Sequence, residues 1–379
     1  MNRLRPLSRL QERVMMPRLT RPDVWLLGAV GGLLGFGIVM VLNVSYFQAE
    51  ARYGDPYLFF RKHVIAVAIG LAFMLLVSRV RLDWLERWAS LMLPLCVLAL
   101  LMVLAPGVGA ERGGARRWIA FGGFSLQPSE FVKLGVVLYL ARWISRHRHV
   151  MHEFGSGVLP ALVAVGACSA LMLGQPDFGT AVILGLLLLL MLYVGGARPA
   201  HVLGLVLCGG VAMGLAVQLA PYRMRRLLAF LDPWAQSQDA GFQLVQSLIA
   251  FGSGGLGGVG LGQSKQKMLF LPEAHTDFIF ALVGEELGLV GALAVLALFA
   301  VVAVRGFRIA ARHPDSFASL LAFGLTAVLL LSAVVNVGVV LGMLPTKGLP
   351  LPFLSYGGSA LLATMLEVGL LAALSRMTG

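Results

Sequence analysis

The sequence predicts an all-α integral membrane protein with about ten transmembrane helices. Of its 379 residues, 58% are hydrophobic and 13% are charged, and the mean hydropathy is +0.85. Soluble domains contain roughly 45–50% apolar and about 25% charged residues, so this composition excludes a water-soluble protein. The apolar residues also gather into ten stretches, each close to the roughly 20 residues that a membrane helix needs.

The ten stretches form one predicted membrane domain, residues 24–376, which follows a basic tail at residues 1–23. Where a stretch contains Gly or Pro, neighbouring helices can satisfy the backbone groups that it frees. The first stretch exceeds the roughly 7–15 apolar residues of a signal peptide, so we expect it to remain as a membrane span. The stretches cover residues 24–42, 59–78, 89–106, 129–144, 157–173, 179–195, 200–220, 277–304, 317–342 and 358–374.

The distribution of Lys and Arg predicts that both termini lie in the cytoplasm. Seventeen of these residues fall on the side of the N-terminus and 12 on the opposite side, five of them in residues 221–276. Cytoplasmic loops carry the excess of basic residues, and long segments count little in this rule. Residues 221–276 are then one long extracytoplasmic loop between helices 7 and 8. The net charge of +12 is assigned to membrane loops and not to nucleic acid binding.

Basic residues on the predicted outer side are informative because the topology does not require them. Residues 241–252 of the long loop have helical apolar spacing and are expected to lie flat on the membrane surface. The glycine-rich run 252–262, followed by Lys265 and Lys267, either cradles a phosphate with its backbone or is a flexible turn. The outer basic residues gather at Arg61 and Lys62, at Arg112, Arg116 and Arg117, and in residues 221–276.

An acidic cluster marks the start of the eighth predicted helix. Asp277 follows Glu273 and His275, and Glu285 and Glu286 come two turns later. Carboxylates in or near a membrane helix are costly and are therefore functional candidates. Asp277 could cap the helix, act as a general base if its pKa is raised, or hold a divalent cation through its oxygens.

The start of the fourth predicted helix carries a second polar group. Glu130 lies in the first turn after a Gln-Pro pair, a favourable position for an acidic residue. Lys133 lies one turn further along the same face, so we predict that it pairs with Glu130 in a polar pocket. Pairing without a pocket is the alternative. Trp118, beside two arginines, either lines this site or belongs to the aromatic belt at the membrane surface.

Residues 344–359 hold three prolines and a pair of glycines, which predicts a rigid, non-helical segment. At membrane depth such backbone is tolerated only when it is buried in protein or lines a cavity, and a tight re-entrant turn is the alternative. Lys347 would add a cation to that cavity. Asp177 lies on the same side, where it could also simply form a turn. Cations, carboxylates and apolar walls together suit an anionic head group attached to a lipid tail.

Five motifs carry a family resemblance. They are Arg117-Trp118-Ile119, Gln127-Pro128-Ser129-Glu130 with Lys133, Gln175-Pro176-Asp177, residues 271–288 and residues 350–359. They resemble the SEDS family (shape, elongation, division and sporulation), and the likeness covers residues 24–376. Gln266-Lys267 and residues 345–348 are more similar to the division members than to the elongation members, and the sporulation members are close to the division members.

The resemblance implies ten helices and a peptidoglycan glycosyltransferase that polymerises lipid II at the outer face of the bacterial cytoplasmic membrane, for septal wall synthesis. It implies a class B penicillin-binding protein transpeptidase as partner, with other membrane proteins of the division machinery. Membrane lipids are further expected partners, and nucleic acid is not. The family's essential acidic residue falls on Asp277, and its Trp, Glu and Lys fall on Trp118, Glu130 and Lys133.

The implied reaction makes Asp277 the catalytic residue that deprotonates the 4-hydroxyl of the acceptor sugar. Basic residues, which Mg²⁺ or Mn²⁺ could assist, would stabilise the leaving diphosphate, and direct attack would invert the anomeric centre. A lipid II flippase, a scaffold that only activates its partner and an elongation-type polymerase are the alternatives. The candidate substrate-binding residues are Arg61, Lys62, Arg116, Arg117, Trp118, Glu130, Lys133, Lys267, His275, Thr276, Lys347 and Ser355.

Overall fold

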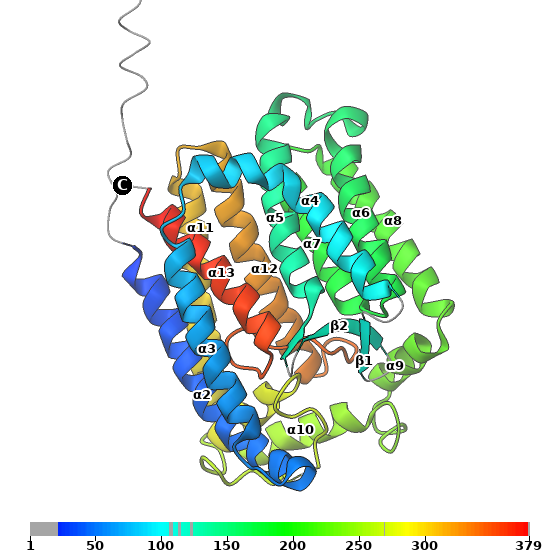
Figure 1. Ribbon diagram of the computed structural model, residues 1–379. Helices are drawn as coiled ribbons and strands as arrows, with labels where there is room; N and C mark the ends of the chain where they lie inside the picture. Colours follow the sequence, from blue (N-terminus) through cyan, green and yellow to red (C-terminus); the bar gives the residue numbers. More distant parts are fainter. Residues whose placement is uncertain (1–21, 106–108, 113–114, 122–123, 269, 378–379) are drawn as a thin grey trace, which may run out of the picture.

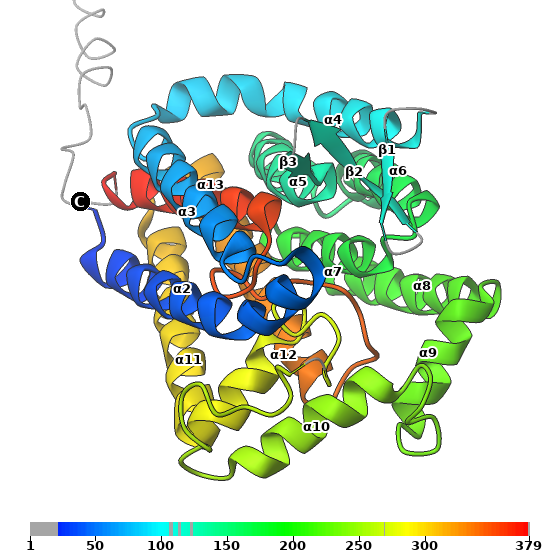
Figure 2. The same cartoon turned by 60° about the horizontal axis from the view of Figure 1, so that its bottom comes forward.

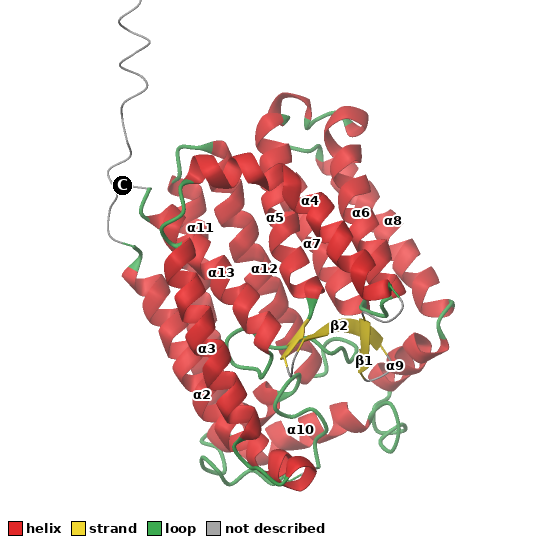
Figure 3. Cartoon of the chain, viewed as in Figure 1, coloured by secondary structure: helices red, strands yellow, loops and turns green. Residues whose placement is uncertain are grey.

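The structure is a computed structural model that describes residues 22–105, 109–112, 115–121, 124–268 and 270–377. Residues 1–21 of the predicted basic tail lie outside these ranges. The described chain is a bundle of long helices, with a small sheet and two shorter helices at one end (Figures 1 and 3). The helices that coincide with the ten predicted spans are α2 (Val24–Tyr53), α3 (Leu58–Val77), α4 (Leu82–Leu104), α5 (Pro128–Arg146), α6 (Leu159–Gly174), α7 (Phe178–Val194), α8 (Pro199–Gln218), α11 (Ile279–Arg312), α12 (Ser316–Val340) and α13 (Gly358–Ser375).

The length and composition of these helices fit a membrane environment. Eight of the described helices are long and apolar enough to cross a membrane, and α7 is apolar but has only 17 residues. The 19-residue α5 differs because it carries charged residues along its length. The predicted all-α membrane fold is confirmed, whereas the number of crossings and the side of each terminus remain predictions.

The two ends of the bundle differ. The loop end carries α9 (Pro221–Leu231), α10 (Phe242–Gly254) and the sheet, at the bottom of Figure 1. At the opposite end, named the terminal end, the backbone N–H of Asp23 donates to Oγ of Ser375 over 3.1 Å. The start of α2 and the end of α13 therefore meet. The helix predicted over residues 241–252 is present as α10, and Figure 2 shows it crossing the loop end.

The segment between α4 and α5 forms a three-stranded antiparallel sheet that the apolar pattern does not reveal. Its strands β1 (Gly109–Arg112), β2 (Ala115–Phe121) and β3 (Phe124–Leu126) are adjacent in that order. Strands of three to seven residues are too short to give a clear alternation signal. The Gln127 backbone N–H, at the entry to α5, donates to Oγ of Ser359 on α13 over 2.9 Å, which fixes the sheet to the bundle.

The long helix α11 is interrupted at Gly288, where φ is 64° and ψ is −162°. The glycine-rich loop replaces the helical hydrogen bonds that this break removes. The Val259 N–H donates to the Glu285 carbonyl and the Leu289 N–H donates to the Gly255 carbonyl, both over 3.0 Å. The loop thus completes the hydrogen bonding of the helix. These contacts do not fit the flexible turn that was considered for the loop.

Replacing Gly288 with Ala is expected to destabilise the protein by about 1–3 kcal/mol, because this backbone region is essentially restricted to glycine. A Cβ at 288 would also lie 2.6 Å from the Leu256 carbonyl oxygen. Thermal unfolding in detergent measures the effect. The matched control is Gly28→Ala in α2, where a Cβ would meet nothing within 4 Å and helix propensity favours Ala. Equal unfolding temperatures for the two variants would contradict the conclusion that the backbone at position 288 requires glycine.

Candidate functional site

Asp277 lies at the loop end, just before α11. The N-cap of α11 is Phe278, and no side chain caps the helix, so the capping role considered for Asp277 is wrong. The side-chain amide of Asn336, on α12, donates to the Asp277 carbonyl over 2.8 Å and to the Leu349 carbonyl over 2.6 Å. These bonds hold the Asp277 backbone against the proline-rich segment 344–359.

The Asp277 carboxylate forms no hydrogen bond or ion pair with any described residue. It lies against Gly348, where an added Cβ would come within 2.9 Å of Oδ2. A larger residue at 348 would therefore crowd the carboxylate. The Asp277 side chain is half-buried, so its oxygens are held at a partly enclosed surface and are available to a ligand.

Burial and the negative charge of Glu273 raise the pKa of Asp277 from 3.8 to about 7. The positive charges of Arg226 and Arg117 act in the opposite direction. A general base works best when its pKa is close to the working pH, because it is then both deprotonated and basic enough to accept a proton. The electrostatics of Asp277 therefore suit proton abstraction at neutral pH.

Arg226 and Arg117 act electrostatically on Asp277, and Lys347 precedes Gly348, which lies against the Asp277 carboxylate. The Lys347 ammonium lies 4.5 Å from the ring centre of Phe178, and burial lowers its pKa to about 8 against the opposing charge of Asp177. The Arg226 guanidinium donates to the Thr346 carbonyl over 3.3 Å. Arg226 belongs to the basic loop 221–276 but was not among the predicted site residues. The cluster of three arginines in α9 was the available signal.

Arg117 reaches the same region from the sheet. Its guanidinium donates to the carbonyls of Gln175 (3.2 Å) and Pro176, and it lies 3.9 Å from Oδ1 of Asp177. Asp177 is buried and accepts from the Thr180 hydroxyl over 3.0 Å, at the start of α7. Asp177 is the N-cap of α7, so its carboxylate caps that helix and also pairs with Arg117.

Glu130 and Lys133 form a buried ion pair over 2.9 Å on α5, with side chains only 3% and 8% exposed. The predicted pairing is present. Glu367 on α13 is also buried, and Lys133 interacts electrostatically with Glu367 and with Asp177 as well as with Glu130. Sequence reasoning missed Glu367, although a single carboxylate inside an apolar helix was the signal for it.

Lys267 lies in a different environment from Asp277. Its ammonium donates to Oδ1 of Asn43 and the Gly262 carbonyl, both over 2.6 Å, and to Oε1 of Glu286 over 3.2 Å. The Glu285 carboxylate accepts in turn from the Lys265 backbone N–H over 3.0 Å. These bonds use the carboxylates of α11 to hold the glycine-rich loop. Lys267 also lines a cavity of about 200 Å³ whose walls include Gln48 and Arg52.

Three further candidates are His275, Thr276 and Ser355. His275 is buried, and its ring lies 4.8 Å from the ring of Phe59 and 5.5 Å from that of Tyr356. Burial lowers its pKa to about 4, so it is neutral at physiological pH. The Thr276 hydroxyl donates to Oε2 of Glu273 over 3.0 Å. Ser355 accepts from the Leu351 N–H over 2.8 Å and so closes a turn.

The remaining candidates are more exposed. Arg61 and Lys62 are exposed at the start of α3, and Arg61 pairs with Asp55. On β2, Arg116 is exposed and Trp118 is half-buried. The side chain of Arg112 lies outside the described residues. The structure therefore brings Arg117 close enough to act on Asp277 and places the Lys347 side chain beside Phe178 and Asp177. It leaves Arg61, Lys62 and Lys267 in other surroundings.

The carboxylate oxygens of Asp277 fit a cation that is shared with a bound phosphate better than a cation held by protein side chains alone. Among the described residues, no group of three or more His, Cys, Asp or Glu side chains could hold a metal ion. Mg²⁺ usually keeps several waters and binds one or two carboxylates together with substrate phosphates. The unpartnered Asp277 carboxylate meets that need, with a phosphate supplying the other oxygens.

Curated relatives match nearly the full length of the chain. One is the "Probable peptidoglycan glycosyltransferase FtsW" of Geobacter metallireducens, which is 42% identical over 374 residues, 98% of this chain and 99% of the relative. Another is "Stage V sporulation protein E" of Bacillus subtilis, which is 40% identical over 362 residues, 96% of this chain and 99% of the relative. These matches agree with the predicted division and sporulation branch.

Solved structures share the fold. A chain of a peptidoglycan synthase complex that coordinates polymerization and crosslinking superposes with a TM-score of 0.79 at 29% identity, covering 94% of this chain and 98% of that chain. RodA of Thermus thermophilus superposes with a TM-score of 0.70 at 28% identity, covering 94% and 97%. The family model described as "Cell cycle protein" matches residues 24–379. The chain therefore belongs to the FtsW, RodA and SpoVE family of cell cycle proteins, the SEDS family that its motifs predicted.

Proposed function

We propose that this protein is a peptidoglycan glycosyltransferase that polymerises lipid II into glycan strands for septal wall synthesis. The observation that carries the proposal is the unpartnered Asp277 carboxylate, whose pKa is about 7, under the influence of Arg226 and Arg117. Lys347 directly precedes Gly348, which lies against that carboxylate. This arrangement combines a base with cations that suit a diphosphate. Relatives at 42% identity that carry the name of this activity support the assignment.

The reaction joins the acceptor sugar to the donor chain with one proton transfer. The 4-hydroxyl oxygen of the acceptor attacks the anomeric carbon of the donor, and its proton passes to the Asp277 carboxylate. The bond between that carbon and the diphosphate oxygen breaks, and the diphosphate leaves with the electron pair. Lys347 and Arg226 stabilise the negative charge that develops. Direct attack from the opposite face inverts the anomeric centre.

A divalent cation, Mg²⁺ or Mn²⁺, would be held by the Asp277 carboxylate and would neutralise charge on the diphosphate. The proposed orientation places the loop end outside the cytoplasmic membrane and the terminal end in the cytoplasm, as the excess of basic residues favours. The proposed partner is a class B penicillin-binding protein transpeptidase. The likeness to a chain of a peptidoglycan synthase complex supports this partnership, because polymerisation and crosslinking act on the same strands.

The direct test is a gel assay of glycan strands made from lipid II by the purified protein, with and without the penicillin-binding protein. Polymer is expected with the partner present. Translocation of lipid II in liposomes without any polymer would instead indicate a flippase. Polymer formation that persists after Asp277 is replaced would indicate that the chain acts only as a scaffold.

The polymerisation rate is expected to fall as pH decreases through about 7, because the active form of Asp277 is the deprotonated one and its pKa is about 7. Glu273→Gln removes the negative charge that helps to raise this pKa, so the fall should move to lower pH. The control is Glu50→Gln, an exposed carboxylate at the loop end, which should leave the profile unchanged. An identical pH profile for all three proteins would contradict the role of Glu273.

A further inference from the structure

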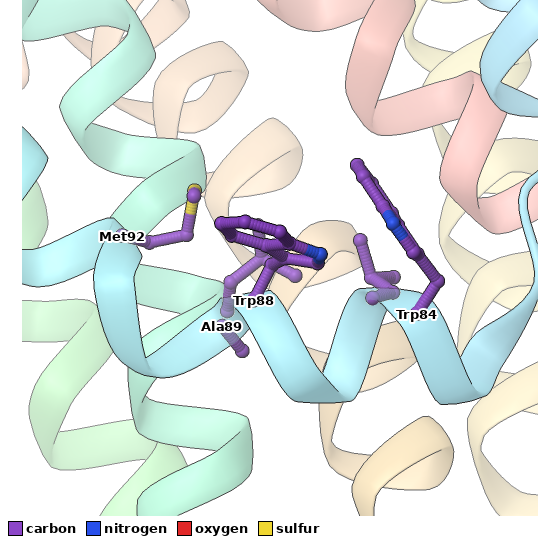
Figure 4. Close-up of a pocket in the computed structure, with 6 residues that line it drawn as sticks. Trp84, Trp88, Ala89 and Met92 are labelled. Carbon is purple, nitrogen blue, oxygen red and sulfur yellow. The ribbon is translucent and has the colours of Figure 1, made fainter.

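The groove between α4 and α5 contrasts with the charged loop end. Its volume is about 380 Å³, and the side chains that line it are all apolar. Figure 4 shows Trp84, Trp88 and Met92 of this lining, all on α4. Such a surface offers no polar group that would orient a ligand. A buried charged side chain that the proposed reaction does not use lies instead at the start of α7, at Asp177.

The burial of Asp177 is nearly complete, with 2% of the residue exposed. Its Oδ1 atom caps α7 by accepting from the Thr180 N–H over 3.4 Å and from the Thr180 hydroxyl over 3.0 Å. Its Oδ2 atom is buried and has no hydrogen-bond partner among the described residues. An uncharged Asn caps a helix equally well, and a buried charge with an unbonded oxygen is costly. Capping alone therefore does not explain a carboxylate at this position.

Three cations compensate the Asp177 charge. The Arg117 guanidinium lies 3.9 Å from Oδ1, and Lys133 and Lys347 interact with Asp177 electrostatically. Lys133 also has its own ion-pair partner, Glu130, at 2.9 Å. In the part of the chain that the structure describes, neither Arg117 nor Lys347 forms an ion pair with another carboxylate. Asp177 is thus the carboxylate that these two cations share.

The two cations belong to segments that border Asp277. Arg117 acts electrostatically on Asp277 from β2, and Lys347 directly precedes Gly348, which lies against the Asp277 carboxylate. Asp177 is buried, so it does not reach a ligand itself. It can act on the reaction only through Arg117 and Lys347, which makes it a positioning residue and not a catalytic one.

We propose that Asp177 is the counter-ion that holds Arg117 and Lys347 in place for the leaving diphosphate. The Arg117 guanidinium also donates to the carbonyls of Gln175 and Pro176, the two residues before Asp177. The three residues 175–177 therefore fix this guanidinium together. The inference deepens the proposed function and rests on it for the identity of the substrate.

The charged groups around Lys347 come from α7, α9 and the segment before α11. Lys347 and Arg223 lie over the same ring, that of Phe178, at 4.5 and 5.1 Å from its centre. Arg226 donates to the carbonyl of the residue before Lys347, and the Asp277 carboxylate lies against the residue after it. Among these surroundings, the charge that acts on the pKa of Lys347 is that of the α7 cap, Asp177.

The second effect of Asp177 is to keep Lys347 protonated. Burial lowers the pKa of Lys347 to about 8, and the negative charge of Asp177 opposes that fall. Because the protonated ammonium is the form that attracts a diphosphate, binding should weaken as pH rises through about 8. Without the Asp177 charge the pKa of Lys347 falls further, so the weakening moves to lower pH.

The test measures the binding of farnesyl diphosphate to the purified full-length protein in detergent, at a series of pH values below and above about 8. Asp177→Asn removes the charge and keeps a favourable N-cap. We expect this variant to lose affinity at lower pH than the wild type, so that its Kd at about pH 8, relative to its Kd at low pH, is several-fold higher. The ionisation of the ligand is the same for every protein and cancels in the comparison.

Two further variants complete the test. Asp177→Ser keeps a cap oxygen without a charge and should behave like Asp177→Asn. The matched control is Asp315→Asn, because Asp315 is the exposed N-cap of α12 and its side chain accepts from the Ala318 N–H over 2.8 Å. This control makes the same change of charge at a helix cap and should keep the pH dependence of the wild type. Thermal unfolding shows that each variant is folded.

The same pH dependence for folded Asp177→Asn and for the wild type would overturn the inference. Absence of binding by the wild type, or binding that does not weaken near pH 8, would overturn it as well, since Lys347 would then not serve a diphosphate. Polymerisation of lipid II is measured separately. A pH shift in Asp177→Asn without any polymer from the wild type would support the counter-ion role and contradict the proposed function.

Discussion

Replacing Asp277 with Asn is expected to reduce the rate of glycan polymerisation by about 10²–10⁴-fold, the usual contribution of a general base. Asn has the same shape, so the backbone bonds from Asn336 and the contact with Gly348 should be kept. It cannot accept the proton of the attacking hydroxyl. The rate is measured from the length and amount of glycan strands made from lipid II, with the penicillin-binding protein present.

The matched control for this variant is Asp239→Asn. Asp239 is an exposed carboxylate in the same loop, residues 221–276, so the two variants change the net charge of the loop end equally. The control should polymerise at the normal rate. If Asp277→Asn also polymerised normally while folding like the wild type, Asp277 would not be the base, and the proposed mechanism would fail.

Replacing Lys133 with Met is expected to destabilise the protein by about 3–5 kcal/mol, the cost of breaking a buried ion pair by removing one partner. The variant would leave Glu130, 2.9 Å from the lost ammonium, and the buried Glu367 without their positive charge. Two uncompensated carboxylates would then lie inside the helix bundle. The measurement is the midpoint of thermal unfolding in detergent at one fixed scan rate.

A double variant makes this prediction specific. Glu130→Gln combined with Lys133→Met removes one of the two uncompensated carboxylate charges and should restore part of the lost stability. The control, Lys265→Met, removes an exposed lysine and should change stability by less than about 0.5 kcal/mol. If Lys133→Met unfolded at the same temperature as this control, the buried cluster would contribute nothing to stability.

Much of the fold could be predicted because it depends on local composition. A membrane helix can be recognised in the sequence as a long apolar run, and each of the ten predicted stretches coincides with a helix. The pairing of Glu130 with Lys133 could be predicted as well, since residues three apart on a helix are neighbours. The sheet from Gly109 to Leu126 could not, because its strands, of three to seven residues, are too short to give a clear alternation signal.

The site was predicted only in part for a related reason. Sequence spacing identified Asp277, but the cations that influence it come from α9 and from the sheet. Lys267 and Lys347 both precede a helix in basic, glycine-containing segments, yet Lys267 is bound by Glu286 whereas Lys347 lies over Phe178. Nothing in the local sequence distinguishes these two outcomes.

By itself the sequence determined the membrane environment, the helices and the family, because each of these depends on residues that are close together in the chain. The tertiary structure alone decided which charges are satisfied and which remain available. It ties Lys267 into the glycine-rich loop and places Glu367 near Lys133. It also leaves the Asp277 carboxylate without a partner among the described residues. The physical reason is that electrostatic interactions depend on distance in space, which for residues on different helices is fixed only by packing.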